Sequence, residues 1–96
     1  MKRVGLNFSL VGEDWVSDIV EMQSSSLILH ADFVGTLKME HNASVFDEFI
    51  PVKDSAGVVV EHSFNGSDEL LFTDGKFGLF VRFIASAEPS KAIILL

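Results

Sequence analysis

The sequence predicts an all-β protein: a single antiparallel β-sandwich, jelly-roll-like, of about seven or eight short strands over residues 1–96. Apolar and polar residues alternate with period two along most of the chain, which is typical of half-buried strands. Turn-forming Gly, Asn, Asp and Pro residues divide the chain at intervals of roughly 8–12 residues, as in sandwiches. Hydrophobic residues make up 48% of the chain, with nine Phe and one Trp, so one compact core can be filled. A chain of 96 residues is expected to form one domain.

The N-terminal segment predicts a strand and then an ambiguous crossing segment. Val4, Leu6, Phe8 and Leu10 alternate with small or polar residues, so a half-buried strand begins almost at the first residue. Residues 11–24 carry apolar side chains at helical spacing, which leaves a short helix as an alternative. A strand or irregular segment is favoured here because all neighbouring segments are predicted to be β.

The longest alternating pattern lies in the middle of the chain. From Ser26 to Val34, one face carries Leu27, Leu29, Ala31 and Phe33, and the other carries Ile28, His30, Asp32 and Val34. After Gly35 the alternation continues through Leu37 and Met39. Asn42–Ser44 then predicts a turn.

The next segment predicts a short strand followed by two turns. Pro51 cannot donate to a ladder, so the strand over Phe46–Lys53 is expected at an edge or a bulge. Asp54–Gly57 predicts a loop in which Gly57 supplies a positive φ. Val58–Val60 is extended again, and Asn65-Gly66 predicts the next turn.

Asp74-Gly75 predicts a β-hairpin with a two-residue turn. In that register Leu70 faces Leu79 and Phe72 faces Phe77, and these residues share an apolar face with Val81 and Phe83. The opposite face of the second strand carries Phe80 and Ile84, which need cover from a flanking segment or another subunit. Glu88-Pro89-Ser90 predicts one more turn before a final strand, Ala92–Leu96.

Charge and composition narrow the classes of function. The net charge is −7, and thirteen of the fourteen acidic residues lie between Glu13 and Asp74, which disfavours nucleic acid and anionic membranes as partners. No apolar run is long enough to span a bilayer, and the N-terminus does not resemble a secretory signal. The absence of Cys excludes disulfides, thiol catalysis and thiolate zinc sites.

The candidate chemical groups do not converge in the sequence. His30 and Asp32 share a strand face while His41 and His62 lie elsewhere, so a metal site or proton transfer is less well supported than solvated surface positions. Asn65, Ser67, Asp68 and Glu69 could bind calcium through oxygen atoms, although a solvated turn explains them better. The chain contains no Gly-x-Ser-x-Gly motif. We therefore expect no catalytic residue, no metal and no cofactor.

The stretch from Ser26 to Leu96 resembles small β-sandwich virion proteins of tailed bacteriophages. The motifs that carry the resemblance are Leu27-x-Leu-x-Ala-Asp-Phe-Val-Gly-Thr-Leu-x-Met-Glu, Phe49-Ile-Pro-Val-Lys-Asp, Phe80-Val-Arg-Phe-Ile and Ala92-Ile-Ile-Leu-Leu. The turn His41–Ser44 and Phe46 depart from the Ser-Asn-Asp-Gly and Trp that many such proteins carry. The resemblance implies a non-enzymatic structural protein of the virion, first of all a capsid decoration, cement or auxiliary head protein.

This resemblance sets the expectations for partners and contact residues. The partner is expected to be the major capsid protein or another virion protein, with homo-oligomers such as a trimer, and the chain would fold in the host cytoplasm before joining the virion. The residues expected at the interface are Val4, Leu6, Phe8, Trp15, Phe80, Arg82 and Ile84. The alternative is a ligand- or carbohydrate-binding module of a phage tail or fibre, for which Trp15 would form an exposed platform. A Trp15 buried in the core would instead be structural.

Overall fold

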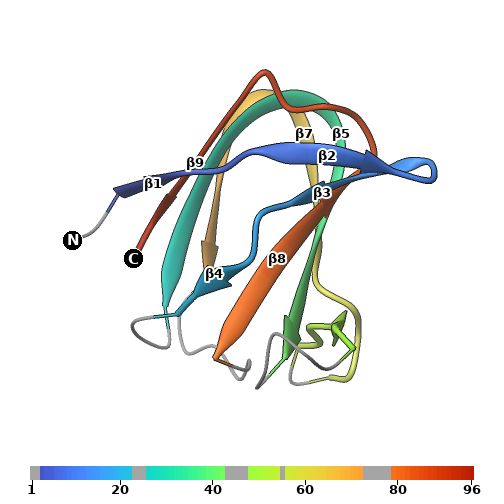
Figure 1. The fold of residues 1–96 in the computed structure, drawn as a ribbon, viewed down its shortest axis with the longest axis vertical. Coiled ribbons are helices and arrows are strands. Elements are labelled where there is room, and N and C mark those ends of the chain that lie inside the picture. The colour runs from blue at the N-terminus through green and yellow to red at the C-terminus, as the bar shows by residue number, and fades with distance from the viewer. Residues whose placement is uncertain (1–2, 23–25, 43–47, 55, 73–78) are drawn as a thin grey trace.

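The computed structural model describes residues 3–22, 26–42, 48–54, 56–72 and 79–96, and in these ranges the chain forms nine strands and no helix (Figure 1). The strands are β1 (Arg3–Gly5), β2 (Phe8–Val11), β3 (Asp14–Ser17), β4 (Val20–Glu21), β5 (Leu27–Asn42), β6 (Ile50–Pro51), β7 (Glu61–Phe72), β8 (Phe80–Ala85) and β9 (Lys91–Leu95). All pair antiparallel within one hydrogen-bonded sheet. The all-β prediction is therefore confirmed. Among these ranges no helix could cross a lipid bilayer.

Strand β5 organises the sheet. Along one edge it pairs with β7 over twelve residues, from Leu27 to Lys38. Along the other edge its first part pairs with β9 and its last part with β8. Strand β1 extends the sheet beyond β9, whereas β3 and then β2 extend it beyond β8. Figure 1 shows β5 and β7 arching together, so that the β9 side and the β8 side diverge and the sheet curls around the core.

The core follows the alternation along these strands. Leu29, Leu37 and Met39 of β5 are fully buried, as are Phe83 of β8 and Ile94 of β9. Each such side chain contributes roughly 1.5–3 kcal/mol by leaving water. The two faces predicted for Ser26–Val34, and their continuation through Met39, are confirmed. The face carrying Val81 and Phe83 is likewise buried, and the face carrying Phe80 and Ile84 is only half-buried.

The arch of β5 is held by the connection between β8 and β9. Thr36 donates its backbone N–H to Ser86 Oγ at 2.8 Å, and the N–H of Ser86 donates to the carbonyl of Thr36 at 2.9 Å. Ser90 donates both its N–H and its hydroxyl to the carbonyl of Asp32, at 3.0 and 2.9 Å. Gly35 lies between these points with φ of 156°, and a Cβ there would come within 2.4 Å of Ser86 Oγ. The arch therefore needs glycine at this position.

Of the two turns predicted between Pro51 and Phe72, one is confirmed and one is wrong. In the Asp54–Gly57 loop, Gly57 has φ of 80°, and Asp54 Oδ1 accepts the backbone N–H groups of Ala56 and Val58 at 2.9 and 3.0 Å. In contrast, Asn65-Gly66 lies within β7, where Gly66 pairs with Phe33. Gly66 has φ of 107°, so its positive φ is accommodated inside the strand and does not reverse the chain.

The predicted pairing of the Asp74-Gly75 hairpin is also wrong, although the turn itself lies outside the described residues. Leu70 pairs with Leu29 and not with Leu79. Strand β5 lies between β7 and β8 and pairs with both of them. The physical reason is that β5 offers β7 a ladder of twelve residues with one apolar face, whereas the turn motif specifies only a local reversal.

The N-terminal third forms strands, as favoured over the helical alternative. Within residues 11–22, a tight turn at Gly12, with φ of 65°, joins β2 to β3, and β4 follows. The single strand predicted from Val4 to Leu10 divides in two. Leu6 is 8% exposed in the core while Leu10 is 58% exposed, because β2 leaves the body of the sheet to pair only with β3.

Candidate functional site

One candidate surface is the outer side of the layer formed by β7, β5, β9 and β1, which we call the outer face. The register aligns its residues in rows across the four strands. One row runs Leu71, Ile28, Leu95, Arg3, the next runs Glu69, His30, Ile93, Gly5, and a third runs Ser67, Asp32, Lys91. These residues face outward because their strand neighbours fill the core.

The outer face is apolar in its middle. A shallow hollow of about 270 Å³ lies there, lined by Arg3, Ile28, His30, Glu69, Lys91, Ile93 and Leu95. Leu71, 62% exposed, lies in the same row as Ile28, and Val34, 68% exposed, lies further along β5 on the same face; these are the two most exposed large hydrophobic residues of the described chain. Both side chains leave apolar surface exposed to water, so the outer face is a candidate for contact with another molecule.

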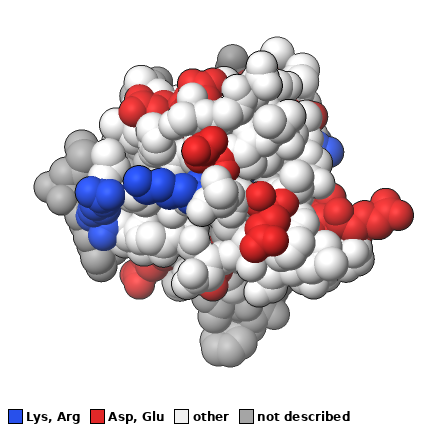
Figure 2. All heavy atoms as spheres, turned by 90° about the horizontal axis from the view of Figure 1, so that it is seen from above, with Lys and Arg blue, Asp and Glu red and all other residues white. Residues whose placement is uncertain are grey.

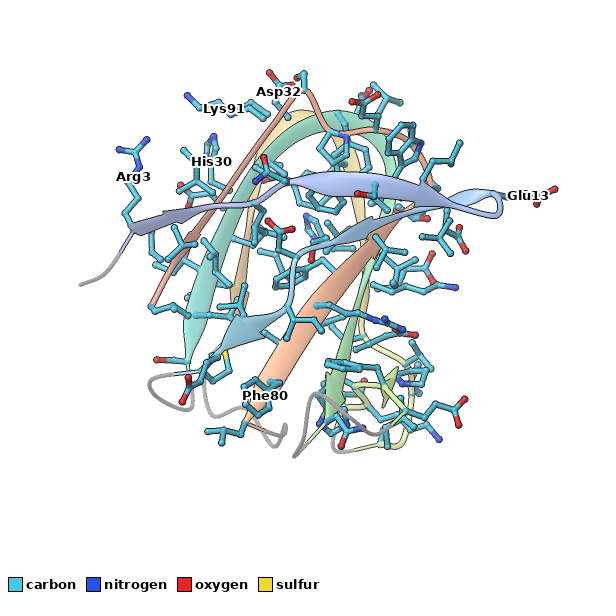
Figure 3. The ribbon with its side chains drawn as sticks, viewed as in Figure 1. Arg3, Glu13, His30, Asp32, Phe80 and Lys91 are labelled. Carbon is cyan, nitrogen blue, oxygen red and sulfur yellow. The ribbon has the colours of Figure 1, made fainter. Side chains whose placement is uncertain are left out.

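Charges on the outer face are separated by sign. The basic residues Arg3 and Lys91 come from β1 and β9, and the acidic residues Glu69 and Asp32 come from β7 and β5. In Figure 3, Arg3, His30, Asp32 and Lys91 lie on one side of the molecule, away from Glu13 and Phe80. Figure 2 shows most of the visible basic side chains at one side of the surface, with acidic side chains spread over the rest. The face is therefore locally balanced in a chain of net charge −7.

His30 joins the two neighbouring polar residues of β7. Its Nε2 lies 3.1 Å from Ser67 Oγ, and its Nδ1 lies 3.5 Å from Glu69 Oε1. The order serine, histidine, carboxylate is that of a hydrolytic triad. Here it follows from ordinary strand register, because Glu69 is directly opposite His30 and Ser67 is the diagonal neighbour. Ser67 lies inside the β5–β7 ladder, unlike a nucleophile presented on a sharp turn.

A second histidine pair lies along β7. His62 Nε2 is 3.0 Å from Asp68 Oδ2, and this hydrogen bond lowers the pKa of the exposed Asp68 carboxyl below its usual 3.8. The ring of His62 meets Phe64 edge-on, with centroids 4.8 Å apart, and Phe64 stacks on Phe33. His62 is thus held by one polar and one aromatic contact.

The described ranges bring together no group of three or more His, Asp or Glu side chains that could hold a metal ion. The four oxygen donors considered for calcium lie in a strand and not in a loop. The side chain of Ser67 is hydrogen-bonded to His30, and that of Asp68 is hydrogen-bonded to His62. These two side chains therefore point to opposite sides of β7.

The N-terminal residues predicted at an interface have mixed positions. Leu6 packs in the core, and Val4, Phe8 and Trp15 are half-buried against it. Trp15 pairs with Leu10 and Ala85 and is half-buried, so it is neither a fully exposed platform nor a fully buried core residue. The exposed apolar residues nearby are Leu10 and Val11, which sequence analysis did not select.

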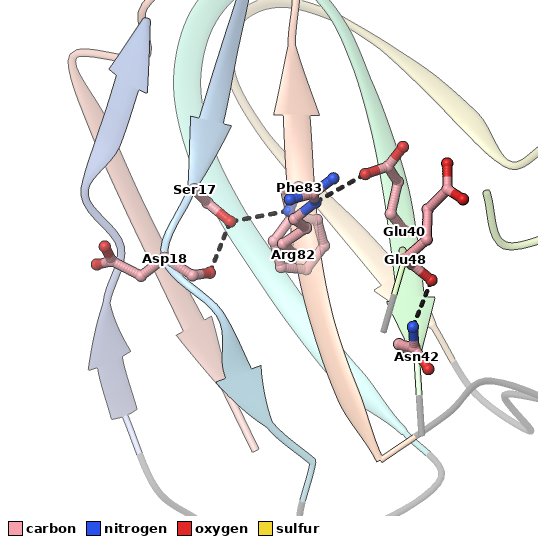
Figure 4. A network of polar contacts seen from close by, with 7 residues as sticks. All are labelled: Ser17, Asp18, Glu40, Asn42, Glu48, Arg82 and Phe83. Atoms are coloured by element: carbon pink, nitrogen blue, oxygen red, sulfur yellow. Dashed lines mark hydrogen bonds and ion pairs between the residues drawn. The ribbon is translucent and has the colours of Figure 1, made fainter. Parts of the chain in front are cut away.

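Arg82 is engaged within the chain. Its Nε donates to Glu40 Oε1 at 2.7 Å (Figure 4). Its guanidinium lies 4.7 Å from the centre of the Phe49 ring. Phe80 and Ile84, on the same side of β8, are half-buried. Of the residues predicted at the interface, none lies on the outer face.

The sequence predicted the part of the outer face that β5 contributes. Ile28, His30, Asp32 and Val34 were assigned to a shared face, but their neighbours from β7, β9 and β1 depend on strand order, which local patterns do not specify. No protein-family description, curated protein or solved structure matches this chain.

Proposed function

We propose that this protein is a non-enzymatic assembly protein that acts by binding other protein subunits through its outer face. The observation that carries this proposal is the exposure of Val34 and Leu71, the two most exposed large hydrophobic residues described, on the face that also carries the apolar hollow of Ile28, Ile93 and Leu95. Burying one such side chain stabilises a contact by roughly 1.5–3 kcal/mol. A few of them per subunit are enough in an assembly of many copies, where multivalency strengthens weak single contacts.

The specific role we propose is that of a bacteriophage virion structural protein, a capsid decoration or cement protein. The support for it is the resemblance of residues 26–96 to small virion proteins of tailed phages. The all-β fold is compatible with that role. Decoration proteins bridge neighbouring subunits of a shell, and an exposed sheet face with an apolar middle and charged margins is suited to such contacts.

The test is incorporation into particles. Purified particles of the phage that encodes the chain should contain it in a fixed ratio to the major capsid protein, measured by quantitative mass spectrometry. Shells that lack it should bind the added protein, and the bound shells should resist heat better than bare shells. Leu71→Glu should bind at least tenfold more weakly, while the matched control Val58→Glu, at a residue 59% exposed elsewhere, should bind as the parent does.

Two results would contradict the proposal. One is the absence of the chain from purified particles that are otherwise complete. The other is unchanged shell binding by Leu71→Glu, which would show that the outer face is not the contact surface.

A further inference from the structure

We infer that the outer face binds a second copy of this chain, face to face, across a two-fold axis that lies between the two sheets and runs along β5 and β9. This inference rests on the proposed function only in using the same face. It names an identical subunit as the molecule that covers the outer face in the free protein, where no shell is present.

The strand order makes the face self-complementary. Basic Arg3 and Lys91 occupy the β1–β9 side, and acidic Glu69 and Asp32 occupy the β7–β5 side. A two-fold axis along the strands places the β1 side of one copy over the β7 side of the other. Each basic side then meets an acidic side, twice per dimer, as an isologous interface requires.

The apolar residues meet at the same time. Ile28, Ile93 and Leu95 lie near the axis because they come from the two central strands of the layer, β5 and β9. Leu71 of the outer strand β7 then comes opposite β1 of the other copy, in the row that contains Arg3. Ile28 of one copy therefore meets Leu95 of the other in the apolar middle, and Arg3 meets Glu69 of the neighbouring row diagonally.

The area that such a contact needs is a modest share of the surface. A stable interface buries about 800 Å² on each partner. That is about a seventh of the 5673 Å² surface of this chain. The local balance of charge also matters, because two chains of charge −7 repel unless they meet at a neutral surface.

A charge exchange between Arg3 and Glu69 tests the arrangement. These residues are three strand spacings apart in the same chain, roughly 14 Å, so they do not pair within it. In the proposed dimer Arg3 lies near the partner's Glu69. Arg3→Glu and Glu69→Arg should each weaken dimerisation at least tenfold, and the double variant should restore it to within about threefold of the parent.

The measurement is sedimentation velocity over a concentration series, with the parent expected at twice the 10.5 kDa of one chain. Lys53→Glu and Glu13→Arg are the matched controls, since they make the same changes of net charge at exposed sites away from the outer face, and they should leave the dimer intact. Circular dichroism checks that each variant is folded.

The inference is overturned if the parent is a monomer or a trimer, if the double variant dimerises no better than the single variants, or if the controls weaken the dimer equally. A monomer in solution that still enters particles would contradict this inference and leave the proposed function standing. A dimer that is absent from particles would contradict the proposed function and leave this inference standing.

Discussion

Replacing Gly35 with alanine tests how the arch of β5 is held. The added Cβ would lie 2.4 Å from Ser86 Oγ and 3.1 Å from the ring of Phe33. Ser86 Oγ cannot move away without losing the bond that it accepts from the N–H of Thr36. The positive φ at position 35 adds backbone strain for any residue with a side chain.

The expected cost follows from these two contributions. Backbone strain of this kind costs about 1–3 kcal/mol. Loss of the hydrogen bond costs about 0.5–1.5 kcal/mol. We therefore expect Gly35→Ala to lower the free energy of unfolding by about 2–4 kcal/mol, which for a domain of this size corresponds to a Tm lower by roughly 8–30 °C.

A double-mutant cycle with Ser86→Ala isolates the contact. Ser86→Ala removes both the clashing oxygen and the hydrogen bond, so Gly35→Ala should cost about 1 kcal/mol less in that background than in the parent. Urea unfolding followed by fluorescence gives each free energy. Gly5→Ala is the control, because no atom lies within 4 Å of a Cβ there and a change below about 1 kcal/mol is expected. Additive costs, or equal costs at the two glycines, would refute the reasoning.

Three further predictions concern side-chain contacts. Ser17→Ala should lower the free energy of unfolding by about 1–3 kcal/mol, because it leaves the buried N–H of Phe83 without the Ser17 Oγ that accepts it at 2.8 Å (Figure 4). Arg82→Met should cost about 1–2 kcal/mol by removing a partly buried ion pair and a ring contact. In a carboxyl NMR titration, His62→Gln should raise the pKa of Asp68 towards 3.8, since the hydrogen bond to His62 is the main cause of its lowering. Because the pKa of Asp68 is lower in the folded state, its stabilising contribution is present above pH 3.8 and is lost as the pH falls through the folded-state value.

Each of these has a matched control. Ser9→Ala, at an exposed serine of β2, should change stability by less than about 0.5 kcal/mol, and an equal effect at Ser17 would contradict the first prediction. Lys53→Met removes an exposed cation and should be nearly neutral, so a comparable loss would show that Arg82 acts only through net charge. An unchanged Asp68 titration in His62→Gln would show that this pair does not form in solution.

The sequence predicted well which face of each strand is buried, because that follows from the alternation of apolar and polar residues. It predicted poorly which strands pair with one another. The faces of β5 and the alternation of β8 were predicted because a buried face needs a side chain at every second position. The positive φ at Gly57 was predicted because a short loop needs it. These features are local, so adjacent residues are enough to specify them.

Strand order was not predictable in the same way. Asp74-Gly75 suggested that β7 and β8 pair, whereas β5 lies between them, because pairing is decided by the whole apolar surface of a long strand. Asn65-Gly66 suggested a turn, although Gly66 accommodates its positive φ inside β7. The outer face depends on strand order, since Arg3, Lys91 and Glu69 become neighbours of the hollow only once β1, β9, β5 and β7 are aligned. This is why the predicted interface residues lie elsewhere.

The most direct measurement is isotope-filtered NMR on a mixture of labelled and unlabelled copies of the chain. If the outer face joins two subunits, intermolecular methyl contacts should arise from Ile28, Ile93 and Leu95, whereas Val58 should give none. Intermolecular contacts confined to other surfaces, or none at a concentration where the mass is that of a dimer, would contradict the assignment of the outer face.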